Sequence, residues 1–118
     1  GIEYQVASHL IMSGETEKGL EIVRTSRKRY DGRIRNPFDE YECGHWYARA
    51  LSSYALLQAL TGLRYDALTG TLYYKSGKGD FRSFISTETG FGNAGVRNGK
   101  PFLDVAYGEI DVREFKAE

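Results

Sequence analysis

The sequence predicts an α+β fold, with three helices followed by a small antiparallel β-sheet. Before Thr69 the apolar residues recur at helical spacing, whereas glycines and alternating apolar and polar residues dominate after it. A chain of 118 residues is long enough for one small domain and too short for two. We therefore expect a helical segment over 1–68 and a β-hairpin segment over 69–118 that packs on it to form one compact unit.

Three helices are predicted in the first segment. Residues 2–12 place Ile2, Val6, His9 and Leu10 on one helical face, and Gly14 provides a stop. Residues 15–30 carry acidic side chains in the first turn and basic ones in the last, the order that the helix dipole favours. Residues 43–61 are apolar on all sides, which predicts a largely buried third helix.

About four antiparallel strands are predicted in the second segment. The runs 71–75 and 81–86 flank a turn rich in glycine, and Asn98-Gly99 is a strong signal for a tight hairpin turn. Alternating patterns over 103–107 and 109–113 predict the last two strands.

The composition argues against several classes of function. Sixteen Lys and Arg balance sixteen Asp and Glu, so no global charge attracts nucleic acid or an anionic membrane. One Cys excludes an internal disulfide, and two distant His residues give no credible zinc site, so we expect no metal and no cofactor. The basic run within 24–35 could contact nucleic acid; we favour a solvated helix end that the helix dipole supports.

Arg49 is the only formally charged residue between His45 and Leu63. An unpaired guanidinium is very costly to bury, and the nearest carboxylates are Asp39, Glu40 and Glu42. A convergent Arg and Glu with aromatic neighbours is the composition of a carbohydrate subsite, because charged groups bind hydroxyls and rings pack against the apolar face of a sugar. The alternative is a structural ion pair that fixes the loop to the helix.

Three stretches of the chain resemble the C-terminal end of glycoside hydrolase family 116, which includes non-lysosomal (bile-acid) glucosylceramidase and bacterial β-glucosidases. Residues 4–11 read YQVASHLI, residues 19–23 read GLEIV, and residues 29–50 read RYDGRIRNPFDEYECGHWYARA. The resemblance extends over the tail, through Arg64-Tyr-Asp and Thr69-Gly-Thr-Leu. It implies the last helices of an (α/α)6 barrel with strands beside them, and a chain that continues the N-terminal part of a longer protein.

The resemblance also implies a function. Members of the family cleave a β-glycosidic bond with retention, which uses two carboxyl groups roughly 5 Å apart. Neither carboxyl motif is found in this chain, so we expect no catalytic residue here and no hydrolysis by the chain alone. Glu40 and Arg49 resemble the family residues that bind the O4 and O6 hydroxyls of the sugar in the −1 subsite. The implied partners are a β-linked glycoside and the preceding part of the chain, and no nucleic acid.

Other residues of the loop are candidates for binding or structural roles. His45 is a candidate substrate-binding residue because it shares a helical face with Arg49. Glu42 is either a second sugar contact or, as we favour, a helix cap or partner of Arg49. Asp39 is assigned a supporting role, and Cys43 a packed structural one. The alternative to a glycosidase is a carbohydrate-binding or structural barrel segment without catalysis, in which Glu40 and Arg49 form only an ion pair.

Overall fold

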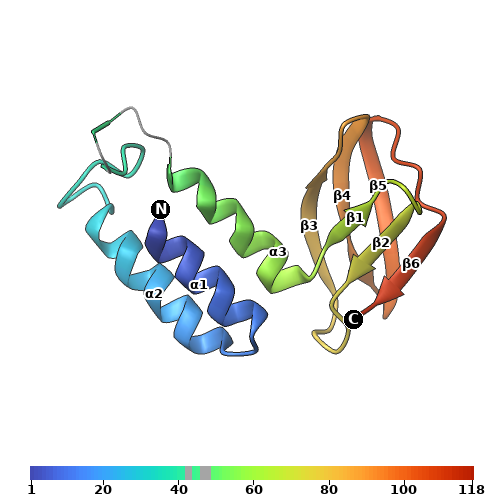
Figure 1. Cartoon of the computed structure of the whole chain (residues 1–118), viewed down its shortest axis with the longest axis horizontal. Helices are drawn as coiled ribbons and strands as arrows, with labels where there is room; N and C mark the ends of the chain where they lie inside the picture. The colour runs from blue at the N-terminus through green and yellow to red at the C-terminus, as the bar shows by residue number, and fades with distance from the viewer. Residues whose placement is uncertain (42–43, 46–48) are drawn as a thin grey trace. The chain divides into compact units, whose positions relative to one another are not determined.

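The computed structural model describes residues 1–41, 44–45 and 49–118, with the backbone alone at positions 49 and 50. The chain forms two compact units, Gly1–Leu60 and Thr61–Glu118. Helices build most of the first unit and strands build the second, as Figure 1 shows, so the predicted α+β class is confirmed.

The first two helices lie close to their predicted bounds. Helix α1 spans Ile2–Met12 and α2 spans Thr16–Arg29. Gly14 ends the first of them at φ +90°, a left-handed conformation that glycine adopts without a steric penalty. The two helices lie side by side in Figure 1.

The buried face of α1 differs from the predicted one. Tyr4, Ala7 and Ile11 are buried, whereas Ile2 and Val6 are exposed. The reason is the close approach of α2 at Gly19, where an added Cβ would lie 2.6 Å from Cγ1 of Ile11 and 2.7 Å from the carbonyl oxygen of Ala7. The contact with Gly19 of α2 thus determines which side of α1 is covered. Tyr4 lies on that side and is therefore in the interior.

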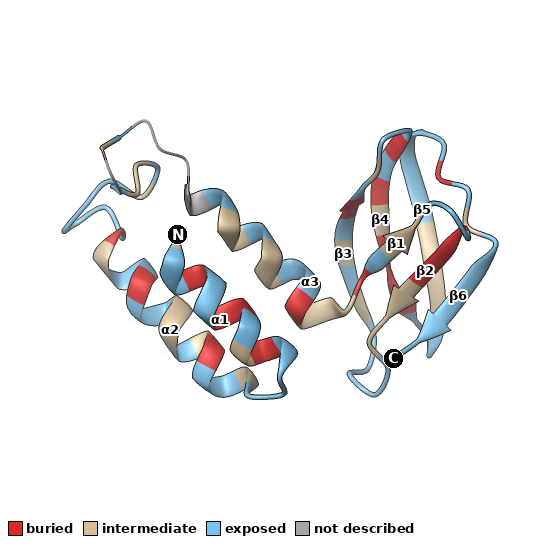
Figure 2. Ribbon diagram, in the orientation of Figure 1, coloured by how far each residue is buried: buried red, intermediate tan, exposed pale blue. Residues whose placement is uncertain are grey.

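The third helix is shorter and more exposed than predicted. The described part of the predicted range 43–61 contains a 3-10 helix, η1 (Arg49–Tyr54), and a short α-helix, α3 (Ala55–Thr61). Leu51, Tyr54 and Leu57 are exposed, so the prediction of a largely buried helix is wrong for these residues. An apolar pattern on every side requires neighbours on every side, and the first unit covers only part of this surface (Figure 2).

The second unit contains six strands in two three-stranded sheets rather than one sheet of about four. The first sheet has the order β1-β2-β6, and the second has the order β3-β4-β5. All pairings are antiparallel except that of β2 with β6, which is parallel. The strands are β1 (Arg64–Asp66), β2 (Thr71–Tyr74), β3 (Phe81–Ser86), β4 (Gly90–Arg97), β5 (Lys100–Gly108) and β6 (Glu114–Ala117).

The change from helix to strand comes earlier than the predicted residue 69. Gly62 has φ +66°, and β1 follows at Arg64–Asp66, inside the range that was expected to be helical. The prediction of a strand over 109–113 is also wrong, because residues 109–113 belong to no strand and the last strand forms at Glu114–Ala117. Backbone bonds explain the shift: the N–H of Arg113 donates to the carbonyl of Gly70 and steers the chain beside β2.

The core of the second unit lies between its two sheets. Leu72 of the first sheet and Ile85 and Ala94 of the second belong to one buried cluster with Leu63 and Ile110. The predicted tight turn is confirmed, since Asn98 and Gly99 have φ values of 53° and 75° and join β4 to β5 as a two-residue loop.

Candidate functional site

Glu40 is a predicted site residue whose side chain contacts both α1 and α2. It lies in the segment between α2 and η1, and its side chain is only 12% exposed. The hydroxyl of Tyr4 on α1 donates a hydrogen bond to Oε1 of Glu40. Nη1 of Arg27 on α2 donates to the same oxygen at 2.6 Å. Two helices therefore hold one loop carboxylate.

The partner predicted for Glu40 lies outside the described residues. The side chain of Arg49 and all of Glu42 and Cys43 belong to that part, so the predicted Glu40–Arg49 pair and the roles of Glu42 and Cys43 lie there too. The described partner, Arg27, was not singled out for this role from the sequence. The sequence signal for it was weak, because Arg27 is one of several basic residues near the end of α2.

Most of that basic run is paired within the first unit. Its described contacts are Arg24 with Glu17, Arg27 with Glu40, Arg29 with Glu3, Arg33 with Asp31, and Arg35 with the ring and hydroxyl of Tyr30. Each of these basic side chains has a partner within the protein. This favours the interpretation of the run as a solvated helix end rather than a phosphate-binding surface.

The loop that carries Glu40 is shaped by local polar contacts. Oδ1 of Asp31 accepts hydrogen bonds from the backbone N–H groups of Arg33 and Ile34. These bonds and the Arg33 side chain lower the pKa of Asp31. Further along, the N–H of Phe38 donates to Oδ1 of Asn36 at 2.9 Å. This Asx-type geometry is a common way for Asp and Asn to order a turn, and it fixes the approach of the chain to Glu40.

A hollow of about 300 Å³ lies beside Glu40 in the first unit. Its lining comprises Tyr4, Val23, Arg27, Pro37, Phe38, Glu40, Ser53 and Leu56. Phe38 is 96% exposed, so its ring is free to contact a ligand at this surface. A volume of this size is at the lower end of the range found for small-molecule sites.

A second hollow of about 230 Å³ reaches Glu40 from another direction. It is lined by Gly1, Ile2, Glu3, Ser26, Tyr30, Glu40 and Tyr41. Among the described residues, Glu40 borders both hollows. Glu40 therefore contributes to the walls of both hollows, even though most of its side chain is covered.

The contacts of Glu40 alter the acid–base properties of its two partners. Burial raises the pKa of the Tyr4 hydroxyl, and its hydrogen bond to Glu40 raises that pKa further. The hydrogen bond to Tyr4 and the contacts with Glu40 also raise the pKa of Arg27, against a smaller effect of burial. The stable arrangement is therefore a neutral phenol and a charged guanidinium on one carboxylate.

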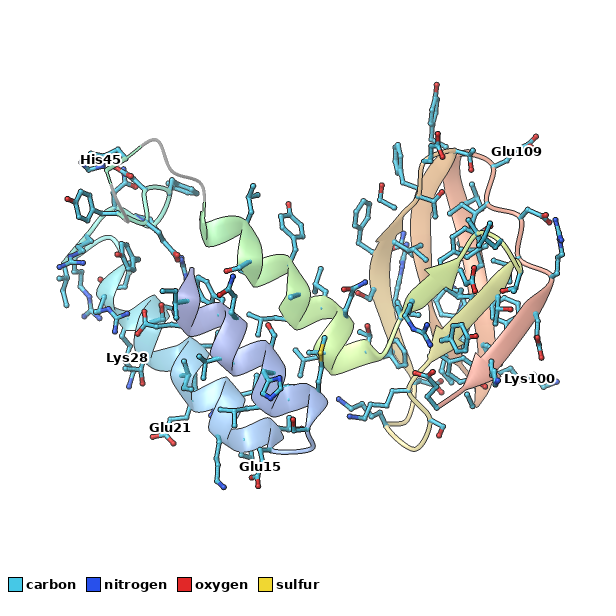
Figure 3. All side chains as sticks on the ribbon, viewed as in Figure 1. Glu15, Glu21, Lys28, His45, Lys100 and Glu109 are labelled. Atoms are coloured by element: carbon cyan, nitrogen blue, oxygen red, sulfur yellow. The ribbon has the colours of Figure 1, made fainter. Side chains whose placement is uncertain are left out.

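His45 and Asp39 form a second polar pair on the same loop. Nδ1 of His45 lies 2.7 Å from Oδ2 of Asp39, and the ring of Tyr41 contacts that of His45 edge-on at 5.2 Å between centroids. Figure 3 labels His45 on this loop, where it is exposed. If Nδ1 carries the proton, Nε2 is an acceptor for a ligand hydroxyl. Neither residue lines the two hollows beside Glu40.

The described residues contain no cluster of three or more metal-ligating side chains. Among them there is also no helix with the length and hydrophobicity needed to span a membrane. No model of a known protein family matches the chain, and a search of curated proteins finds no significant match.

Proposed function

We propose that this chain is the C-terminal portion of a retaining β-glycosidase of the β-glucosidase or glucosylceramidase type. In this proposal Glu40 and Arg49 bind the sugar in the −1 subsite, and the reacting carboxyls belong to the preceding part of the protein. The resemblance of residues 29–50 to glycoside hydrolase family 116 supports it. The observation that carries it is a mostly covered Glu40 carboxylate at the edge of a hollow that also presents the exposed ring of Phe38.

The chemistry of these groups suits a neutral sugar. A carboxylate accepts strong, charge-assisted hydrogen bonds from hydroxyl groups, and an aromatic ring packs against the apolar C–H face of a pyranose. Binding energy of this kind orients and distorts the sugar at the reacting centre, which accelerates cleavage without direct participation in the chemistry.

The proposal includes an origin of the helices in an (α/α)6 barrel. The exposed apolar side chains of η1 and α3 support it, because contiguous apolar surface on a helix ordinarily packs against a partner. We propose that the remainder of the barrel covers Leu51, Tyr54 and Leu57.

The test is an NMR titration of the chain with methyl β-D-glucopyranoside. We expect resonances of Phe38 and Glu40 to shift, and we expect Glu40→Gln to weaken binding about tenfold or more, since hydrogen bonds to charged groups contribute roughly 1.5–3 kcal/mol. Glu21→Gln, on the exposed surface of α2, is the matched control and should bind as the wild type does. Equal affinity of the Glu40→Gln and wild-type chains would contradict the proposal.

One observation favours a second candidate, a carbohydrate-binding or structural segment without catalysis. Glu40 already has two partners, Tyr4 and Arg27, so its carboxylate has a structural use without a ligand. Hydrolysis of an aryl β-glucoside by the longer protein distinguishes the two functions. Activity that falls strongly in Arg49→Ala supports the glycosidase, and a longer protein that binds the glucoside without cleaving it supports the second candidate.

A further inference from the structure

We infer that Tyr4 and Arg27 are positioning residues, which fix the orientation of the Glu40 carboxylate so that it can accept a hydrogen bond from a sugar hydroxyl. The inference rests on the proposed function, because it assigns a purpose to Glu40. It extends that function to two residues on different helices, neither of which was a candidate from the sequence.

One oxygen of the Glu40 carboxylate accepts both of its described hydrogen bonds. Both the Tyr4 hydroxyl and Nη1 of Arg27 bond to Oε1 of Glu40. A carboxylate has two oxygens and about four acceptor sites, so these two bonds leave the acceptor sites of Oε2 to other donors. The contacts therefore fix the plane of the carboxylate without occupying both of its oxygens.

The helices that present Tyr4 and Arg27 to Glu40 are packed closely together. Tyr4 is 2% exposed, and Ala7 and Ile11, on the same face of α1, are completely buried. Gly19 of α2 packs against that face with no room for a side chain. Tyr4 and Arg27 are thus presented by two closely packed helices, although Glu40 itself lies on a loop. A binding side chain on a loop is positioned more precisely when residues of rigid elements hold it.

Arg27 also compensates the charge of the Glu40 carboxylate. A single carboxylate with little exposure is unfavourable unless a cation or donors compensate it. Arg27 supplies the compensating charge at 2.6 Å, while its side chain remains 45% exposed. The Glu40 carboxylate can therefore accept hydroxyl hydrogen bonds with no cation from the ligand, which suits a neutral sugar.

The experiment is a cycle between protein variants and ligand variants. Tyr4→Phe, Arg27→Gln and Arg27→Lys are titrated with methyl β-D-glucopyranoside and with its 4-deoxy and 6-deoxy analogues, followed by NMR. Arg24→Gln is the matched control, because Arg24 lies on the same helix and pairs with Glu17 instead of Glu40. The carboxyl carbon-13 resonance of Glu40 in the free protein provides a second readout that needs no ligand.

We expect Tyr4→Phe and Arg27→Gln each to weaken binding of the glucoside about three- to tenfold, the size of one ordinary hydrogen bond. The penalty should vanish for the deoxy analogue that lacks the hydroxyl bound by Glu40, Arg27→Lys should recover part of the affinity, and the Glu40 resonance should move in Tyr4→Phe but not in Arg24→Gln. A general loss of structure would weaken all three ligands equally and leave no such pattern.

The outcomes separate the inference from the function on which it rests. If Glu40→Gln weakens binding but Tyr4→Phe and Arg27→Gln do not, or if they weaken all three ligands equally, the positioning role is wrong and the proposed function stands. If the wild type does not respond to the glucoside, the proposed function fails and the inference fails with it. Should Tyr4→Phe not fold, the two Arg27 variants decide the question alone, because Arg27 is half exposed.

Discussion

Nη1 of Arg27 lies 2.6 Å from Oε1 of Glu40, which joins the end of α2 to the loop that follows it. The two side chains differ in exposure, at 45% for Arg27 and 12% for Glu40. Loss of the arginine would leave the more buried partner charged and incompletely satisfied, which costs more than the loss of a surface ion pair.

Replacement of this arginine should therefore destabilise the protein measurably. We expect Arg27→Gln to lower the free energy of unfolding by about 1–2 kcal/mol, between the values typical of exposed and buried pairs. Urea denaturation followed by circular dichroism measures the change. Arg24→Gln, whose partner Glu17 is well exposed, should stay within about 0.5 kcal/mol of the wild type. Equal effects of the two substitutions would show that Glu40 does not depend on Arg27.

Gly19 should tolerate no side chain. A Cβ at this position would lie 2.6 Å from Ile11 and 2.7 Å from the backbone oxygen of Ala7, so α1 and α2 would have to separate. We expect Gly19→Val to lower the free energy of unfolding by about 2 kcal/mol or more, as overpacked cores do, and to weaken the contact of Tyr4 with Glu40. Lys18→Ala is the control for a helical substitution on the exposed side. Thermal melts of the three proteins give the comparison, and an unchanged melting temperature for Gly19→Val would refute the close approach.

The sequence predicted elements whose signals are local. The helices near 2–12 and 15–30 follow from apolar spacing and charge order, and the turn at Asn98-Gly99 follows from backbone preferences of those two residues. Each of these features depends on neighbours within a few positions, and the structure places each within a residue or two of its prediction.

The features that were missed depend on contacts distant in sequence. The pairing of β6 with β2 leaves no mark in the alternation of either strand, whereas the alternation over residues 109–113 predicts a final strand that the structure does not contain. The two described partners of Glu40 are also distant from it in the sequence, since Tyr4 lies 36 residues away on α1 and Arg27 lies 13 residues away on α2. Even the buried face of α1 could not be inferred from hydrophobicity alone, because the contact with Gly19 decided it.

The hairpin between β4 and β5 should lose stability in acid through Asp80. Its carboxylate accepts hydrogen bonds from the backbone N–H groups of Gly99 at 3.0 Å and Asn98 at 2.6 Å, and these bonds lower the pKa of Asp80. A carboxyl whose pKa is lower in the folded state stabilises the fold above its unfolded pKa of about 3.9, and that contribution is lost as the pH falls through the folded value.

Asp80→Asn should remove this part of the acid dependence. We expect the variant to be less stable than the wild type at neutral pH and the difference to shrink below pH 4. Melting temperatures measured across the acid range give the result. Asp104→Asn, which loses a side-chain contact with Arg97 instead of backbone bonds, is the matched control on the same hairpin. A constant difference between Asp80→Asn and the wild type at every pH would contradict the role of the ionised carboxyl.

At the alkaline end, Tyr4 should limit the stability of the helical unit. Burial and the bond to Glu40 raise the pKa of its hydroxyl above the unfolded value of about 10. The neutral phenol therefore contributes stability that is complete below about pH 10 and is lost as the pH rises through the higher folded pKa, since a phenolate there would face the Glu40 carboxylate. Tyr4→Phe cannot ionise, so its melting temperature should fall less between pH 9 and 11 than that of the wild type. Tyr107→Phe removes an exposed hydroxyl from β5 and should retain the wild-type slope. Identical alkaline slopes for Tyr4→Phe and the wild type would mean that the hydroxyl of Tyr4 does not face a charged carboxylate. That result would contradict the contact between Tyr4 and Glu40 on which the candidate site depends.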